Sequence, residues 1–275
     1  MQVLNDPYPW WSGLDNPLSI IDLMAAGTIP SDLAASLWWA VEHGASFFTA
    51  GGPSGAGKST LANALLSFLP ETARLYVVSG RDDPFQLPQG SQPTYLLISE
   101  VSSHGRPFYL SGPAALRAFA MLRSGVRMIG TLHAESVEEA VTDVLSDEMG
   151  VPDTDIAGIT FIAIIRVDGP RDEHGRVERR RTDLTRRVIE IGLLCEGKSG
   201  VNIVNLAAWN EGLGRLESAS GAVAAFAAWA GKVPAIVDAA IREQAAILND
   251  LLNTGRRSPD DVAAAVRAYR AQAYI

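Results

Sequence analysis

Short apolar runs alternate with longer amphipathic segments over roughly the first half of the chain. Helical periodicity marks 17–26, 31–43, 61–69, 113–124 and 136–150, with Ser31 as a predicted N-cap and Gly44 as a stop. Between them, apolar runs predict strands at 45–50, 73–79, 94–98 and 126–131. Strands that alternate with helices indicate an α/β fold with a mostly parallel sheet and flanking helices. In such folds ligands bind at the carboxyl ends of the strands.

The pattern changes after residue 155. Segments 156–167, 187–194 and 201–209 predict extra strands, the first two joined by the charged loop 168–185. The remaining tail is Ala-rich and helical, with helix starts at Pro234 and Ser258 and a stop at Gly255. We therefore predict an N-terminal helical lead-in at 1–44, a core at 45–215 and a helical C-terminal region at 216–275.

A glycine-rich loop lies between the predicted strand 45–50 and the helix that follows it. Its motif has the form G-x(4)-G-K-[ST], the pattern of a P-loop, or Walker A motif. Backbone N–H groups of such a loop and the amino end of its helix bind phosphate. This context predicts a P-loop NTPase core of the RecA-like type that binds ATP and Mg²⁺. The cofactor-binding residues are Gly52, Pro53, Ser54, Gly55, Ala56, Gly57, Lys58, Ser59 and Thr60, with Lys58 on the β- and γ-phosphates and Ser59 as the Mg²⁺ ligand.

Three further positions at strand ends are candidate catalytic residues. Glu100 follows an apolar strand, where a carboxylate polarises an attacking water. His133, together with Thr131, follows the next strand and is placed to contact the γ-phosphate or its water. Asp83 follows the strand 73–79, where it would assist at the Mg²⁺ ion or the water, although an acidic turn before Pro84 explains the same residues. His43, His104, His133 and His174 have no metal-ligand spacing.

Composition and charge narrow the class of protein. The chain has 275 residues, is 47% hydrophobic and carries a formal net charge of −8. The acidic balance argues against general nucleic-acid binding, which needs a basic excess. The longest apolar stretch, 156–165, is too short to span a bilayer, and residues 1–7 lack the features of an export signal. One cysteine excludes an internal disulfide. We expect a cytoplasmic protein without a membrane span.

Taken in order, these segments resemble the ATPases of the type II/type IV secretion superfamily, which drive pili, archaella and secretion systems. Segments 17–23 and 27–29 are similar to the region that precedes the P-loop in archaeal-type members. Residues 82–87 resemble the acidic box of the family, 95–100 its Walker B and 131–134 its His box. The segment 186–191, Trp209 with Asn210, and the helices 241–252 and 262–269 are similar to its later strands and C-terminal helices.

The resemblance implies ATP hydrolysis that energises protein export or filament assembly. It also implies membrane-embedded platform proteins as partners, a homo-oligomer in the form of a hexamer, and a position at the inner face of the membrane. The chain departs from the family at Ser102, where the Walker B arginine is expected, and at Thr94 and Gln86, where acidic residues are expected. The link between the acidic box and Walker B is shortened and lacks the helix that carries arginines in the family, and we predict that the separate N-terminal domain is missing. An arginine-supplying partner is therefore a further expectation.

Other functions fit parts of the same sequence. An ABC ATPase would place its signature before Walker B, whereas the similar residues Leu110, Ser111 and Gly112 follow Glu100. A P-loop small-molecule kinase would use the same phosphate loop, but no arginine-rich lid lies near it in the sequence. The basic segment 176–187 is better explained as a solvated hairpin than as an anion or lipid contact. A nucleotide-binding assembly or regulatory subunit without turnover is the non-enzyme alternative.

Overall fold

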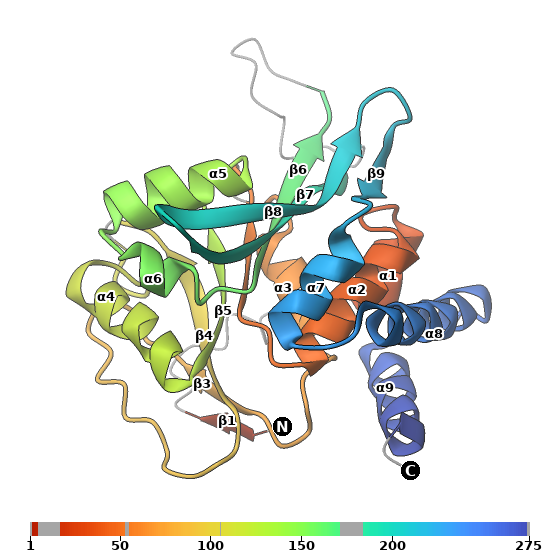
Figure 1. Cartoon of the computed structure of the whole chain (residues 1–275), viewed down its shortest axis with the longest axis horizontal. Coiled ribbons are helices and arrows are strands. Elements are labelled where there is room, and N and C mark those ends of the chain that lie inside the picture. Colours follow the sequence, from red (N-terminus) through yellow and green to blue (C-terminus); the bar gives the residue numbers. More distant parts are fainter. Residues whose placement is uncertain (1, 5–16, 53–54, 105, 171–183, 274–275) are drawn as a thin grey trace.

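The computed structural model describes residues 2–4, 17–52, 55–104, 106–170 and 184–273. The described chain is a mixed α/β fold in which helices flank one sheet (Figure 1). The order of strands in the sheet is β1-β3-β4-β5-β2-β6-β7-β8-β9. The strands are β1 (Gln2–Leu4), β2 (Phe47–Ala50), β3 (Arg74–Val77), β4 (Thr94–Val101), β5 (Arg127–Leu132), β6 (Phe161–Asp168), β7 (Thr185–Gly197), β8 (Gly200–Asn210) and β9 (Arg215–Ser218).

The helices fall on the two faces of this sheet. Those of the first face are α1 (Ile20–Ala25), α2 (Ser31–Glu42), α3 (Lys58–Leu66), α7 (Ala222–Ala230), α8 (Pro234–Asn253) and α9 (Pro259–Ala273). Those of the second are α4 (Gly112–Ala120), which a 3₁₀ turn (Met121–Ser124) extends, α5 (Val137–Glu139), which continues as a π-helical segment (Ala140–Glu148), and α6 (Asp153–Ile156).

The sheet has a parallel and an antiparallel part. Neighbouring strands from β1 through β3, β4, β5 and β2 to β6 are parallel, whereas β6 to β9 pair antiparallel. Strand β5 lies between β2 and β4. The carboxyl ends of β2, β4 and β5 therefore meet at one edge of the sheet, as the alternation of strands and helices predicts.

Alternate side chains of the central strands enter two separate hydrophobic cores. Phe47 of β2 belongs to the core under α1, α2 and α3, and its ring stacks on Phe161 with centroids 5.1 Å apart. Phe48 belongs to the core under α4 and stacks on Phe119 at 5.9 Å. Parallel strands covered on both faces need such continuous apolar runs.

Some predicted boundaries are wrong. The strand predicted at 156–167 begins only at Phe161, because Asp153–Ile156 form α6. Pro152 gives α6 an extended N-cap, and the buried Asp155 forms an ion pair with Arg123 at 2.7 Å. Ser31 is the first residue of α2 rather than its cap, which is Pro30. The short strands β1 and β9 carry too few residues for a periodic signal.

The C-terminal helices pack on the N-terminal helices. Arg270 of α9 donates from Nε to the Glu42 carboxylate at 2.6 Å and from its other nitrogens to the carbonyls of Phe68 and Leu69, just after α3. Gln244 of α8 donates to the second Glu42 oxygen at 3.0 Å. The regions predicted at 1–44 and 216–275 therefore share one core, and their division into domains stays a prediction.

Arg270→Ala should lower the free energy of unfolding by about 1–3 kcal/mol, because it leaves buried acceptors without a donor. The Arg270 and Glu42 side chains are 16% and 9% exposed. Thermal or urea denaturation measures the change. Arg267→Ala is the matched control, since its contact with Glu71 spans 3.9 Å between exposed side chains and should contribute little. Equal stability of both variants would show that the hydrogen bonds of Arg270 contribute little to the stability of the fold.

Within the described residues, no single helix is long and apolar enough to cross a membrane. Helices α7 and α8 together pass the same test of length and composition, but they are bent by 112° at their junction.

Candidate functional site

The predicted phosphate loop lies in the sequence between β2 and α3, as its motif predicts. Gly57 is the N-cap of α3 and has φ +102°, a left-handed conformation that suits glycine. Lys58 is the first residue of the helix, and its carbonyl accepts from the Thr49 hydroxyl at 2.9 Å. This bond fixes the start of α3 to the end of β2. Pro53 and Ser54 lie outside the described residues.

Lys58 brings a buried ammonium group to this loop. The residue is 6% exposed, and its Nζ donates to the Gly51 carbonyl at 3.3 Å. The same atom lies 3.7 Å from Oε2 of Glu100. Burial lowers the pKa of Lys58, and the Glu100 carboxylate opposes that shift. Among the described residues, Glu100 is the one carboxylate that forms an ion pair with Lys58. A partly desolvated cation of this kind is well placed to bind an anion such as phosphate.

An irregularity in β4 positions Glu100. The register runs from Ile98 opposite Gly130 to Val101 opposite Leu132, so Ser99 and Glu100 together face one residue of β5. Such a bulge re-aims a side chain at the end of a strand. The Glu100 carbonyl accepts from the N–H of Leu110 at 2.9 Å, which holds the strand end in place. The sequence predicted Glu100 at the strand end, but not the bulge.

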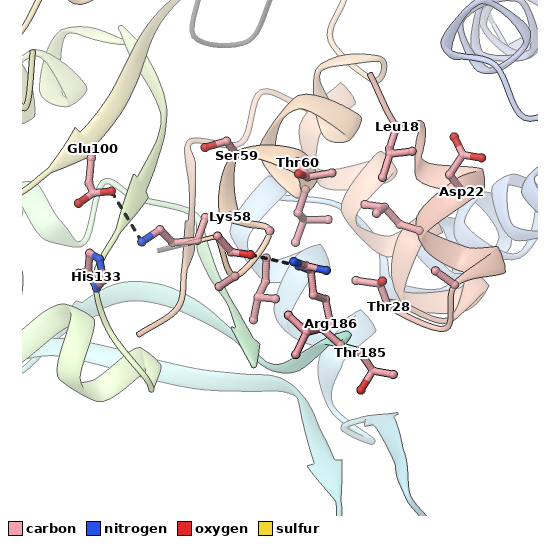
Figure 2. A pocket seen from close by; sticks show the side chains of 18 of the residues that line it. Leu18, Asp22, Thr28, Lys58, Ser59, Thr60, Glu100, His133, Thr185 and Arg186 are labelled. Atoms are coloured by element: carbon pink, nitrogen blue, oxygen red, sulfur yellow. Dashed lines mark hydrogen bonds and ion pairs between the residues drawn. The ribbon is translucent and has the colours of Figure 1, made fainter. Parts of the chain in front are cut away.

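Most of the predicted nucleotide-binding residues line one cavity of about 620 Å³. This volume is within the usual range for small-molecule sites. Residues 55–60 form one wall, and Glu100 and His133 are also in contact with the cavity. Figure 2 shows Glu100 and His133 on one side of Lys58, with Leu18 and Asp22 on the other. The structure thus brings together the predicted phosphate loop, Glu100 and His133, which are three of the four groups predicted for the site.

Ser59 is suited to hold Mg²⁺. Its side chain lines the cavity next to Lys58, and its hydroxyl makes no hydrogen bond to the residues that the structure describes. Mg²⁺ prefers oxygen ligands and keeps several waters, so one hydroxyl with the phosphates and water is an ordinary donor set for it.

Asp83 lies away from this cavity. It is fully buried, and its carboxylate accepts four hydrogen bonds: from the Tyr76 hydroxyl, the Ser79 N–H and hydroxyl, and the Phe85 N–H. These bonds close the turn after β3, which is the alternative that the sequence left open. Thr131 is also outside the lining, and its hydroxyl donates to the Ser99 carbonyl at 2.6 Å.

Two residues near the loop were not predicted as site residues. Arg186 of β7 lines the cavity, and its Nε donates to the Gly55 carbonyl at 3.1 Å. Glu135, just after β5, lies so close to Gly52 that a Cβ there would collide with its side chain. Glu135 follows His133 by two residues, close to a strand end, and this position could have identified it from the sequence as a candidate site residue. No local pattern could connect Arg186 to a loop 131 residues earlier.

Comparison with known proteins gives partial matches. No family model matches the chain. Uncharacterized protein MJ0900 of Methanocaldococcus jannaschii is 29% identical over 50% of this chain and 28% of its own length. Uncharacterized protein MJ0781 of the same organism is 34% identical over 34% of this chain and 13% of its own length. The chain thus spans less than a third of either relative.

Among solved structures, the chain is similar to the ATPase DotB of Legionella pneumophila. The superposition covers 84% of this chain and 58% of DotB, at 13% identity and a TM-score of 0.38. A TM-score of this size does not establish a common fold.

Proposed function

We propose that the chain binds and hydrolyses Mg-ATP as a RecA-like P-loop ATPase. The observation that carries this proposal is the buried Lys58 ammonium at the amino end of α3, 3.7 Å from the Glu100 carboxylate at the edge of the same cavity. A phosphate-binding cation and a carboxylate able to orient water are two of the groups that a protein contributes to ATP hydrolysis. The parallel strands β2 and β4 hold them together at the sheet edge.

Each side chain then has a distinct role. Lys58 leaves Glu100 and binds the β- and γ-phosphate oxygens, which frees the carboxylate to accept a proton from the attacking water. His133 contacts the γ-phosphate or this water from the end of β5. Ser59 ligates Mg²⁺, which when bound supplies positive charge that offsets the charge of the phosphates.

We further propose that this activity serves a secretion or pilus-assembly machine at the inner face of a membrane. The order of the Walker A, Walker B and His-box segments supports this proposal. Membrane-embedded platform proteins and a homo-oligomer are the proposed partners. The alternative functions use the same cavity but differ in what happens to the bound ATP. A regulatory subunit would bind ATP without turnover, and a kinase would transfer phosphate to a small acceptor.

Mg-ATP should stabilise the protein against thermal unfolding, and Lys58→Ala should abolish the effect. At a concentration about 100 times its dissociation constant, a ligand that binds only the folded state stabilises it by about 2.7 kcal/mol. Differential scanning fluorimetry with and without Mg-ATP measures the shift. Lys198→Ala in the exposed β7–β8 turn is the matched control and should keep it.

A shift that survives in Lys58→Ala would disprove phosphate binding at this loop. Phosphate release from Mg-ATP then distinguishes the ATPase from the regulatory subunit, and transfer to a panel of small acceptors identifies the kinase. Binding without either reaction would favour the regulatory alternative.

A further inference from the structure

The cavity extends beyond the phosphate loop toward α1. Leu18, Leu23 and Ala26 give this end an apolar wall, and Thr28 adds a hydroxyl. Figure 2 shows Leu18 and Thr28 on the side of Lys58 opposite to Glu100. Leu18 is 48% exposed although it is a large apolar residue. An exposed leucine at the rim of a cavity offers surface to a ligand at no cost to the core.

Arg186 forms the other side of this end. Its guanidinium donates to the Gly55 carbonyl at 3.1 Å, and a Cβ built at Gly57 would lie 3.2 Å from its Cδ. Within the described part of the chain, no carboxylate forms an ion pair with it. Figure 2 shows the guanidinium between the phosphate loop and α1.

The neighbouring Arg187 has a different environment. It donates to the Asp168 carboxylate at 3.0 Å and lies over the Trp209 ring, 5.5 Å from its centroid. Successive side chains of a strand point to opposite faces, so the two arginines serve different surfaces. Arg187 holds β7 to its neighbouring strands, whereas Arg186 faces the cavity.

We infer that the nucleobase and ribose of the nucleotide bind at this end, between Leu18 on one side and the Arg186 guanidinium on the other. The inference rests on the proposed function, because Lys58 and Glu100 assign the phosphates to the opposite end and so fix the direction of the nucleotide. A planar guanidinium stacks on aromatic rings, and an aliphatic side chain packs on the other ring face. Arg186 is then a nucleoside-binding residue and not a source of charge at the γ-phosphate.

The binding of Mg-ATP and of Mg-tripolyphosphate tests the two ends of the cavity separately, because only ATP carries a nucleoside. In titration calorimetry, Arg186→Ala should weaken Mg-ATP binding about tenfold, the scale of a cation–π contact. Leu18→Ala should weaken it by about the same factor, because it removes apolar surface that would pack on the base. Both variants should bind Mg-tripolyphosphate like the wild type. Arg187→Ala is the matched control and should keep its affinity for both ligands, and circular dichroism checks that each variant folds.

A failure of the nucleoside site and a failure of the proposed function give different results in these titrations. Unchanged Mg-ATP affinity in both variants would overturn the nucleoside site, and so would an equal loss of both ligands in Arg186→Ala, which would place the guanidinium on the phosphates. In either case, loss of both ligands in Lys58→Ala would leave the proposed function intact. If the wild type binds neither ligand, the proposed function itself fails, and the nucleoside site fails with it.

Discussion

Glu100→Gln should lower steady-state ATP turnover about 100-fold or more while keeping Mg-ATP affinity, because a positioned general base contributes about 10²–10⁴ in rate. The amide cannot accept the proton of the attacking water, but it has nearly the same size as the carboxylate. Affinity should stay equal or rise, since the variant removes the anion that competes with phosphate for Lys58. Phosphate release under saturating Mg-ATP and calorimetric titration give the two quantities.

Glu196→Gln is the matched control, because this exposed carboxylate lies near the β7–β8 turn. It should leave both turnover and affinity unchanged. Undiminished turnover in Glu100→Gln would reduce Glu100 to a partner of Lys58 in the nucleotide-free protein. The search for the base would then move to Glu135, whose side chain lies against Gly52. Asp83 is a poor substitute, since its four hydrogen bonds already fix it in a turn.

The positions of Lys58 and Glu100 at the edge of the sheet could be predicted from the sequence, because local signals place each residue at or just after the end of a buried strand. The P-loop motif places Lys58 after one buried strand, and an apolar run places Glu100 at the end of another. Parallel pairing then brings the carboxyl ends of both strands to the same edge. The distance of 3.7 Å between the two side chains also depends on the bulge in β4, which no periodicity shows.

Arg186 could not be predicted in the same way. The sequence favoured a solvated hairpin for the basic segment 176–187, of which 176–183 lie outside the described residues. The antiparallel register places Arg186 opposite Val167 of β6, and β6 is the strand next to β2. Its contact with Gly55 therefore follows from the pairing of three strands. Such a contact is a property of the tertiary fold and not of the local pattern.

The isolated chain should bind Mg-ATP well but hydrolyse it slowly, and a partner that supplies an arginine should accelerate hydrolysis by about 10³–10⁵-fold. The γ-phosphate gains charge in the transition state, and a guanidinium against it stabilises that charge. Among the described residues that line the cavity, Arg186 is the one arginine. It lies on the other side of Lys58 from Glu100 (Figure 2). Ser102 stands where the resemblance expects an arginine in the Walker B segment.

The dependence of ATP turnover on protein concentration distinguishes two sources of an arginine that acts on the γ-phosphate. If a second copy of the chain supplies the arginine, turnover per molecule should rise with concentration, and mass measurement with a non-hydrolysable ATP analogue should show an oligomer. If a partner of the secretion or pilus machinery supplies it, turnover should respond to that protein and not to concentration. Fast turnover that is independent of both would mean that the chain already holds its full catalytic set, because no external charge would then be limiting the rate.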